Sequence, residues 1–443
     1  MGLSIGIDFG SAYTKAVYAA EGCEPQIICT RAKRPWTPSM VARRPRWGTL
    51  LLGEAALWVA ERDPKNAIVL LPRLLGRRCD DPEVLRLQQR VAYDILSGEI
   101  TGGPFPAWVM VGDRAYAPVE LAAAILEEVR RDAEAALGQP VTRAAVTVPA
   151  CSDFRQRYEI WLAARMAGLE VVRLVEAPVA AVYGFGMARV AEGSRTVLVY
   201  DLGGSRFEAG VVTWIDEKWV TESVVQDSWL GGETFDQVIV DQMMARLESR
   251  HPGMGQRLRA DPESMWKLKV AAERAKKLPS WMPSADVLVV GALRGELDVD
   301  EEIQREEFEA WIHPHIAGTL ALVGRTLEKA GLTIADIDAV LLAGGSTRLP
   351  LVRRLLVEKF GEEKIKADVD PMLCNALGAA AVAARSAGVV CAENHENEAD
   401  MRYCGRCNRP LRAEPWQKCP HCGALHDPRE TVCGLTGGPL GRG

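Results

Sequence analysis

The sequence contains no long apolar run, no excess of positive charge and no recognisable secretion signal. None of its hydrophobic stretches approaches the ~18 residues that a membrane-spanning helix needs, so we expect no integral membrane protein. The formal net charge is −6 at pH 7, which argues against a general affinity for nucleic acid or for anionic membranes. The first residues read as a strand that runs directly into Asp8, unlike a cleaved signal. We therefore expect a cytoplasmic protein.

Cysteine is scarce over most of the chain. Five of the 11 cysteines are scattered, and the other six fall within the last 53 residues, at Cys391, Cys404, Cys407, Cys419, Cys422 and Cys433. Such clustering favours a local metal site over a disulfide framework. With 443 residues, 48% of them hydrophobic and 25% charged, the chain reads as globular with about three domains.

Two near-identical turns carry the clearest chemical signal. The sequence DFGS at 8–11 follows an apolar strand, and DLGGS at 201–205 follows another. The carboxylate of each turn can hold hydrated Mg²⁺, and the glycines let successive backbone N–H groups form a concave nest for an anion. Either turn alone would be read as a hairpin. Their repetition favours a clamp for the phosphates of a nucleotide.

The rest of the pattern predicts α/β layers. Apolar residues recur with helical spacing at 119–137 and 154–167, and a polar helical stretch covers 235 to about 278. Short apolar strands interleave with these helices, and the repeated turn suggests two related lobes around a cleft. We expect residues 34–39 to be irregular and exposed, and 388–400 to be an acidic tether.

These motifs together resemble the nucleotide-binding half of the seventy-kilodalton heat-shock chaperones, which have the two-lobed actin-like ATPase fold. The resemblance covers about residues 5 to 384. It rests on eight motifs in the family's order: IGIDFGSAYTK at 5–15, TPSMVA at 37–42, AAVTVPA at 144–150, AGLEVVRLVEAPVAA at 167–181, DLGGSRFE at 201–208, WLGGETFD at 229–236, AAERAKK at 271–277 and LLAGGSTRLP at 341–350. It implies an α/β fold with duplicated mixed sheets around a nucleotide cleft.

The resemblance also implies roles for the matching residues. Asp8 and Asp201 would hold Mg²⁺, mostly through water. Catalysis would use Glu176, Asp201 and Glu208. ATP or ADP would be held by Gly10, Ser11, Ala12, Tyr13, Lys15, Gly203, Gly204, Ser205, Gly231, Gly232, Glu273, Lys276, Lys277, Gly344, Gly345, Ser346 and Arg348. Taken alone, AAERAKK at 271–277 would fit a solvated helix face equally well.

One departure from the family weakens the expectation of catalysis. Pro72 stands where the family has a lysine that contacts the transferring phosphate. Losing such a contact costs ~2.7–4 kcal/mol, on the order of 100- to 1000-fold in rate. Lys15, seven residues after Asp8, has the spacing of a phosphate-contacting lysine in actin and could offset part of this loss. The alternative for Lys15 is an exposed strand lysine.

Both glycine turns also differ from the family. Ser11-Ala12 replaces a pair of threonines, while Ser205, Arg206 and Glu208 replace a glycine, a threonine and an aspartate. We favour a surface or interface role for Arg206. Nucleotide binding is therefore predicted, and hydrolysis, if it occurs, would be weak.

The end of the sequence departs in architecture. The chaperones continue into a peptide-binding domain, but only 58 residues follow Arg385, so we expect no peptide binding of that kind. Two CxxC pairs, Cys404/Cys407 and Cys419/Cys422, have the spacing of a zinc ribbon, with a redox pair as the minor alternative. Cys391, His395, His426 and Cys433 could form a further site, but their spacing matches none, so we discount it. Structural zinc and contact with a protein partner are the expectations.

The resulting hypothesis is an ATP-binding, chaperone-like nucleotide switch. We expect a nucleotide-binding domain at 1–385 with lobes at about 1–185 and 186–385, an acidic linker at 386–402, a zinc ribbon at 403–426 and a flexible tail at 427–443. ATP, magnesium and zinc would be the cofactors. Two alternatives remain: a nucleotide-locked scaffold without useful ATPase activity, which Pro72 and Arg206 favour, and an actin-like filament former.

Overall fold

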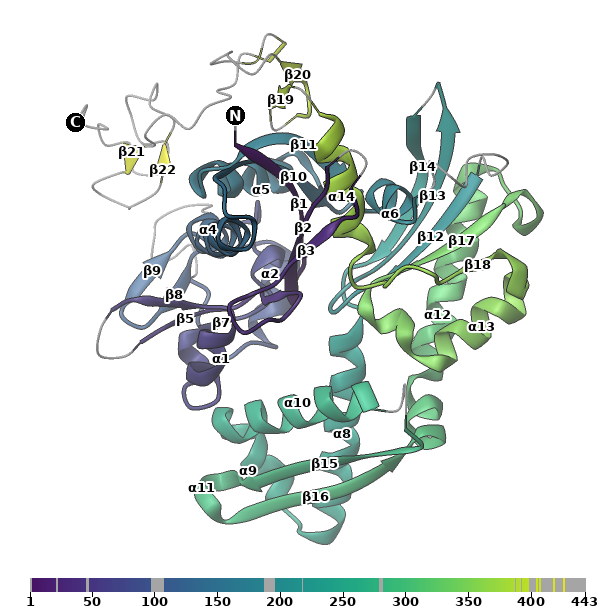
Figure 1. Cartoon of the computed structure of the whole chain (residues 1–443). Helices are drawn as coiled ribbons and strands as arrows, with labels where there is room; N and C mark the ends of the chain where they lie inside the picture. Colours follow the sequence, from purple (N-terminus) through teal and green to yellow (C-terminus); the bar gives the residue numbers. More distant parts are fainter. Residues whose placement is uncertain are drawn as a thin grey trace.

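A computed structural model of the chain describes residues 2–20, 23–44, 48–96, 107–186, 196–216, 218–278, 282–386, 388–391, 393–397, 404, 406–407, 417–418 and 425–426. These residues form two large sheets flanked by helices, together with two smaller units (Figure 1). Among them, no helix combines the length and the apolar character that crossing a bilayer requires.

The first large sheet has the strand order β11-β10-β1-β2-β3, with β4 paired to β2. Its strands are β1 (Leu3–Phe9), β2 (Tyr13–Tyr18), β3 (Gln26–Ile28), β4 (Thr37–Pro38), β10 (Val141–Val148) and β11 (Glu170–Glu176). β1, β10 and β11 are parallel, whereas β2 and β3 run antiparallel to their neighbours. Ile5 and Ile7 are fully buried in a core shared with α4 (Pro118–Leu137) and α5 (Phe154–Met166).

The second large sheet repeats this arrangement in the order β18-β17-β12-β13-β14. Its strands are β12 (Thr196–Leu202), β13 (Phe207–Ile215), β14 (Lys218–Asp227), β17 (Ala339–Ala343) and β18 (Ile365–Lys366). The parallel and antiparallel pairings are the same as in the first sheet, with β12 in the place of β1 and β13 in the place of β2. The predicted duplication is confirmed, and the two Asp–Gly turns occupy equivalent positions in it.

Helices α6 (Ala177–Gly184) and α14 (Cys374–Arg385) lie between the two sheets (Figure 1). Buried residues of α6 share one core with strands of the second sheet and another with strands of the first. The two helices cross at Gly378, where an added Cβ would overlap the carbonyl oxygen of Ala180. Only glycine permits this close approach, so the sheets are joined through a tight helix crossing.

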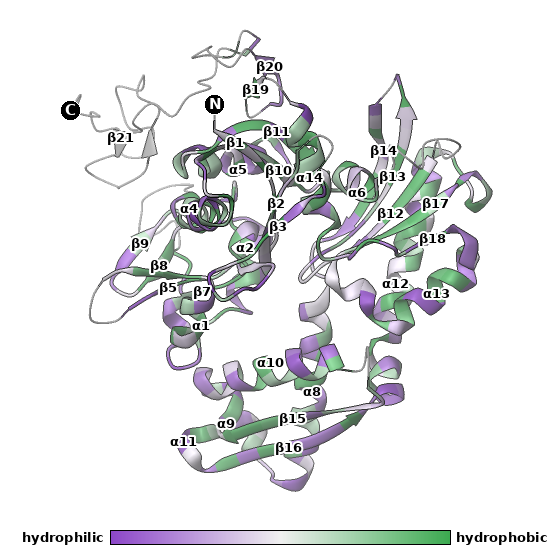
Figure 2. Cartoon of the chain, in the orientation of Figure 1, coloured by the Kyte–Doolittle hydropathy of each residue, from purple (hydrophilic) through white to green (hydrophobic). Residues whose placement is uncertain are grey.

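Two smaller units flank the sheets. One contains α1 (Glu54–Ala60), α2 (Pro82–Gln88), β5 (Val41–Arg43), β6 (Leu50–Leu52), β7 (Ala67–Ile68), β8 (Val109–Val111) and β9 (Arg114–Tyr116). The other contains α8 (Gly232–Arg250), α9 (Met254–Ala260), α10 (Pro262–Lys277), α11 (Ala292–Gly295), β15 (Ser284–Gly291) and β16 (Leu297–Gln304). Helices α12 (Arg305–Ala330) and α13 (Pro350–Phe360) cover the second sheet. Figure 2 shows the hydrophobic residues gathered in the central strands.

Some local expectations were wrong. The helical stretch predicted from 235 to 278 is three helices, because Gly253 takes a left-handed conformation (φ 82°) and Pro262 opens α10. Residues 37–39 are buried in or beside β4, although an exposed segment was expected. The β15–β16 hairpin was not predicted.

The segment expected as an acidic tether is partly structured. β19 (Val389–Val390) pairs with β20 (Glu396–Asn397), and β19 is buried. Farther on, β21 (Gln417–Lys418) pairs with β22 (Leu425–His426). The domain boundaries given above remain predictions.

Candidate functional site

The first Asp–Gly turn is held by polar contacts from three segments. Oδ2 of Asp8 accepts from Nζ of Lys15 at 2.9 Å, and Oδ1 accepts from the hydroxyl of Thr147 at 2.8 Å. The hydroxyl of Ser39 donates to the carbonyl oxygen of Gly10 at 2.6 Å. Lys15 therefore lies at the turn, as the spacing suggested. Thr147 and Ser39 were quoted only within motifs, and their contacts were not anticipated.

Asp201 lies next to the last residue of β12 and is partly buried. The pKa of its carboxyl group is raised to about 6, mainly by burial. A hydrogen bond of 3.0 Å from Nδ2 of Asn375 lowers this pKa, and the charge of Asp8 raises it. The negative charge of Asp8 therefore disfavours ionisation of Asp201. A divalent cation between them would relieve this repulsion, and two carboxylates are suitable ligands for Mg²⁺.

The two turns approach each other directly. A Cβ added to Gly204 would lie 3.0 Å from the Cβ of Ala12. Gly232 is similarly restricted, since an added Cβ would lie 2.8 Å from the hydroxyl of Ser346 and 2.9 Å from Nζ of Lys276. A side chain at either glycine would therefore crowd the neighbouring segments. A phosphate chain would suit this arrangement, because glycine-rich turns can offer backbone N–H donors and Lys15 supplies a cation beside the first turn.

Polar residues of α10 line the adjoining part of the site. The hydroxyl of Tyr13 donates to Oε1 of Glu273 at 3.2 Å, and Nζ of Lys277 lies 2.7 Å from the same oxygen. Nζ of Lys276 is 2.9 Å from the carbonyl oxygen of Gly232 and forms an ion pair of 2.7 Å with Asp236. Tyr13 comes from the first turn, so this contact spans from β2 to α10.

The GGSTR segment after β17 forms the opposite side. The hydroxyl of Ser346 donates to the carbonyl oxygen of Gly203 at 3.0 Å, which joins this segment to the second turn. Gly344 lies against that turn as well, since an added Cβ would be 2.6 Å from Oδ1 of Asp201. Arg348, in contrast, forms an ion pair of 2.5 Å with Asp370. The predicted nucleotide-contacting segments are thus brought together.

Of the two glutamates predicted to be catalytic, Glu208 is the more suitable as a base. It lies opposite Asp201 in the β12–β13 register and is almost fully buried. Its pKa is raised to about 7, mainly by burial. The positive charge of Arg206 lowers this pKa, and the negative charge of Asp201 raises it. One carboxylate oxygen accepts weakly from the N–H of Ala150 at 3.4 Å, and the other has no hydrogen-bond partner among the described residues. Such a group can accept a proton near neutral pH.

Glu176 is engaged differently. Its carboxylate accepts from Nη2 of Arg157 at 2.8 Å, and the same guanidinium reaches the carbonyl oxygen of Ala150 at 3.3 Å. Both side chains of this ion pair are partly exposed. The ion pair leaves Glu176 less available as a base than Glu208.

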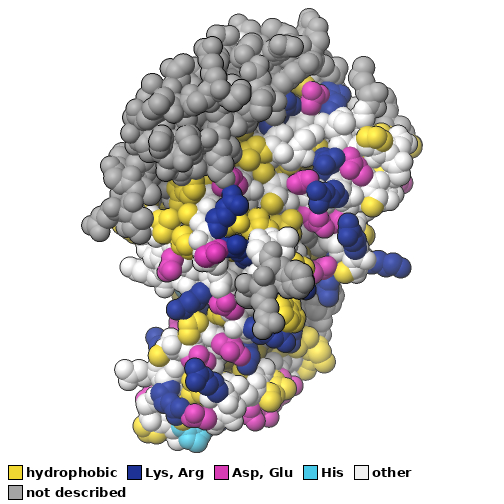
Figure 3. All heavy atoms as spheres, turned by 90° about the vertical axis from the view of Figure 1, so that its left-hand side faces the viewer, with side chains coloured by type: hydrophobic (Ala, Val, Ile, Leu, Met, Phe, Trp, Pro, Cys, Tyr) yellow, Lys and Arg dark blue, Asp and Glu magenta, His cyan; other side chains and the backbone are white. Residues whose placement is uncertain are grey.

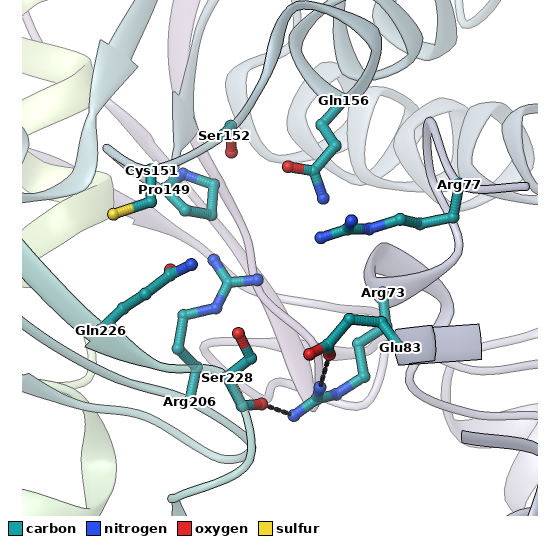
Figure 4. A pocket seen from close by; sticks show the side chains of 10 residues that line it. All are labelled: Arg73, Arg77, Glu83, Pro149, Cys151, Ser152, Gln156, Arg206, Gln226 and Ser228. Atoms are coloured by element: carbon teal, nitrogen blue, oxygen red, sulfur yellow. Dashed lines mark hydrogen bonds and ion pairs between the residues drawn. The ribbon is translucent and has the colours of Figure 1, made fainter. Parts of the chain in front are cut away.

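Arg73, beside Pro72, joins the first unit to the second turn. Its guanidinium donates to the carbonyl oxygens of Ser205 and Ser228 and lies over the ring of Trp229 at 4.1 Å. Burial lowers its pKa to about 10. Figure 4 shows Arg73 pointing to Ser228, away from Arg206 and Arg77, which point into the cavity between them. Because its guanidinium is buried and held by these two carbonyl oxygens, Arg73 does not replace the missing lysine.

Among the described residues, two of the predicted zinc ligands lie in a group with two residues outside the predicted set. One ligand atom from each of Cys391, His395, Cys404 and Cys407 lies within 4.8 Å of the others. Cys391 and His395, which the sequence spacing led us to discount, thus lie beside Cys404 and Cys407. Burial opposes ionisation of Cys404, but the N–H groups of Cys407 and Arg406, at 3.5 and 3.4 Å from its sulfur, lower its pKa to about 6. The predicted ligands Cys419 and Cys422 lie outside the described residues.

Comparison with known proteins agrees with the motifs. A family model described as Hsp70 protein matches residues 4–396. The chain is also 34% identical over 390 residues to a protein named chaperone protein dnaK1 from Synechococcus elongatus. This alignment covers 86% of the chain and 57% of that relative, so the chain spans little more than half the length of the relative.

Proposed function

The chain belongs to the Hsp70 family, and from this membership we propose that it binds a magnesium–adenine nucleotide complex and acts as a nucleotide-dependent switch in a chaperone-like role. The observation that carries the proposal is the opposition of the two duplicated turns. A Cβ added to Gly204 would lie only 3.0 Å from the Cβ of Ala12 across the site, and the charge of Asp8 adds to the raised pKa of Asp201.

The described residues suit the parts of such a ligand. Asp8 and Asp201 would hold Mg²⁺, mostly through water, and the metal would supply positive charge to the phosphates. The phosphate chain would lie on the backbone of the turns at 10–13 and 203–205. The adenosine would lie between α10, with Glu273, Lys276 and Lys277, and the segment at 344–348.

Hydrolysis would be slow in this arrangement. Glu208 would take the proton of the attacking water, since it is buried, has a raised pKa and retains a free oxygen among the described residues. Pro72 supplies no charge to the transferring phosphate, and Arg73 is held by Ser205 and Ser228. We therefore expect nucleotide binding without rapid hydrolysis.

The proposed switch would act through contacts that cross the site. Tyr13 of the first turn touches Glu273 of α10, and Arg73 touches the second turn, so a bound nucleotide would tie the two sheets together. A protein partner would recognise the nucleotide-dependent conformation. On the face drawn in Figure 3, basic side chains lie among acidic ones, which suits a protein better than nucleic acid.

Calorimetric titration with magnesium and ATP or ADP tests the binding step. Heat of binding is expected for the wild-type chain, and Asp201→Asn should weaken the affinity by at least about tenfold, because one carboxylate near the metal is lost. The absence of binding heat in folded wild-type protein would refute the proposal. Turnover of radiolabelled ATP in the same two proteins then measures hydrolysis.

A nucleotide-locked scaffold is the second candidate. Two observations support it. Pro72 carries no charge, and the guanidinium of Arg73 is held by the carbonyl oxygen of Ser205, so neither residue provides a cation that can move to the transferring phosphate. Purified protein that retains ATP without forming ADP would favour the scaffold over the switch.

A further inference from the structure

The four-residue group after α14 has the geometry of a metal site. The sulfurs of Cys391 and Cys407 are 3.6 Å apart, and the sulfur of Cys404 is 3.6 Å from Nδ1 of His395. A tetrahedral zinc site with Zn–S bonds of ~2.3 Å places its ligand atoms ~3.8 Å apart. A disulfide would require ~2.05 Å between sulfurs. The observed separations therefore suit a shared metal ion and not a covalent bond.

Two of these ligands bracket a turn that is docked on the first large sheet. Cys391 follows β19 directly, and His395 precedes β20. The N–H of Asn394 donates to the carbonyl oxygen of Cys391 at 2.9 Å, and Asn394 takes a left-handed conformation (φ 60°). The side-chain oxygen of Asn394 accepts a hydrogen bond of 3.1 Å from the N–H of Leu174 in β11. Its side-chain nitrogen donates one of 3.0 Å to the carbonyl oxygen of Leu174.

Further contacts fix the same segment to the first sheet unit. The indole N–H of Trp161 donates to the carbonyl oxygen of Val390 at 2.9 Å, and Arg173 pairs with Glu396. Arg143 donates to the carbonyl oxygen of Gly388 at 2.8 Å. The turn that carries Cys391 and His395 is thus preorganised by the folded sheet, which lowers the cost of assembling the metal site.

We propose that Cys391, His395, Cys404 and Cys407 bind one structural Zn²⁺, in place of a ribbon formed by Cys404 and Cys407 with Cys419 and Cys422. Three thiolates and one imidazole fill the tetrahedron and leave no open position, so the site is structural and not catalytic. The ion holds the segment around Cys404 onto the docked turn at Asn394.

Cadmium-113 NMR of the full chain distinguishes the two arrangements without any mutation. The proposed site has three sulfur ligands and one nitrogen ligand, and the ribbon has four sulfur ligands. We expect a signal in the S₃N range. A spectrum that contains only an S₄ signal would overturn the proposal.

Two double variants and zinc analysis locate the ion. Cys391→Ser with His395→Ala should lose one equivalent of zinc, whereas Cys419→Ser with Cys422→Ser should retain that equivalent. Cys151→Ser, at an exposed cysteine distant in sequence, is the matched control and should keep the wild-type content. The reverse pattern, with zinc lost only from the Cys419/Cys422 variant, would refute the proposal.

Hydrogen exchange adds a readout that does not depend on the variants. Chelation of zinc from the wild-type chain should speed exchange at the amide of Leu174, because its acceptor is the side chain of Asn394. Amides in the middle of β1 should be unaffected. Unchanged exchange at Leu174 after complete zinc removal would show that the ion does not hold the turn.

Discussion

The side-chain amide of Asn375 donates a hydrogen bond of 3.0 Å to Oδ2 of Asp201, which joins α14 to the second Asp–Gly turn. α14 is one of the two helices that cross between the sheets, so the candidate magnesium ligand is coupled to the element that holds the sheets together. A change in the charge or position of Asp201 would therefore alter a hydrogen bond made by this helix.

The buried carboxyl groups predict opposite effects of pH on stability and on binding. Burial raises the pKa of Asp201 to about 6 and that of Glu208 to about 7, so the native state binds more protons than the unfolded chain. These groups should make the nucleotide-free protein more stable as the pH falls from about 8 to about 4. Thermal unfolding at several pH values measures this, and Glu208→Gln should flatten the upper part of the profile.

Binding should respond to pH in the other direction. Magnesium needs Asp201 in its ionised form, so the affinity for the magnesium–nucleotide complex should fall about tenfold per pH unit well below pH 6. Calorimetric titrations at pH 7.5 and pH 5 compare the two states. An affinity that does not change would exclude Asp201 from the metal site.

Replacing each of the two candidate bases in a separate variant should distinguish their roles. Glu208→Gln removes the proton acceptor with a raised pKa and should lower single-turnover ATP hydrolysis by about 100-fold, with little change in nucleotide affinity. Glu176→Gln should have a smaller effect on hydrolysis, since Glu176 is paired with Arg157. The two rates are measured with saturating ATP. A larger loss in the Glu176 variant would reverse the assignment.

Restoring a cation at position 72 should increase hydrolysis. Pro72→Lys places an ammonium group where the resemblance implies a phosphate contact, and we expect single-turnover hydrolysis to rise by on the order of 100-fold. Pro72→Ala is the matched control for the backbone change and should leave the rate near that of the wild type. Equal rates in the two variants would show that the missing lysine does not limit catalysis.

The helix crossing predicts a sensitive glycine. Gly378→Ala should destabilise the protein by about 1–3 kcal/mol or more, because the added Cβ would overlap the carbonyl oxygen of Ala180. Gly318→Ala in α12 is the control: nothing lies within 4 Å of its added Cβ, and alanine should stabilise that helix by up to about 1 kcal/mol. Denaturant unfolding of both variants tests the contrast.

The sequence predicted the features of this protein that local chemistry determines. The two Asp–Gly turns were identified because adjacent residues define them, and α4 was placed to within one residue because its apolar spacing ends at Gly138, which has φ 65°. The duplication was then inferred from the turns. Each of these signals lies within a short stretch of chain.

The features that were missed depend on contacts between distant positions. Thr147 bonds to Asp8 across 139 positions and Asn375 to Asp201 across 174, and no local pattern marks either residue. A site that includes Cys391 and His395 was discounted because their spacing matches no common zinc motif. The folded sheet brings them to Cys404 and Cys407, and sequence spacing does not report that.

The contact of Asn394 with Leu174 also has a consequence for solubility. β11 is the outer strand of its sheet, and an outer strand with free N–H and carbonyl groups can add a strand from another molecule. The amide of Asn394 occupies both groups of Leu174. A chain that lost this turn would leave both groups of Leu174 open at the sheet edge, so we expect such a chain to self-associate more readily.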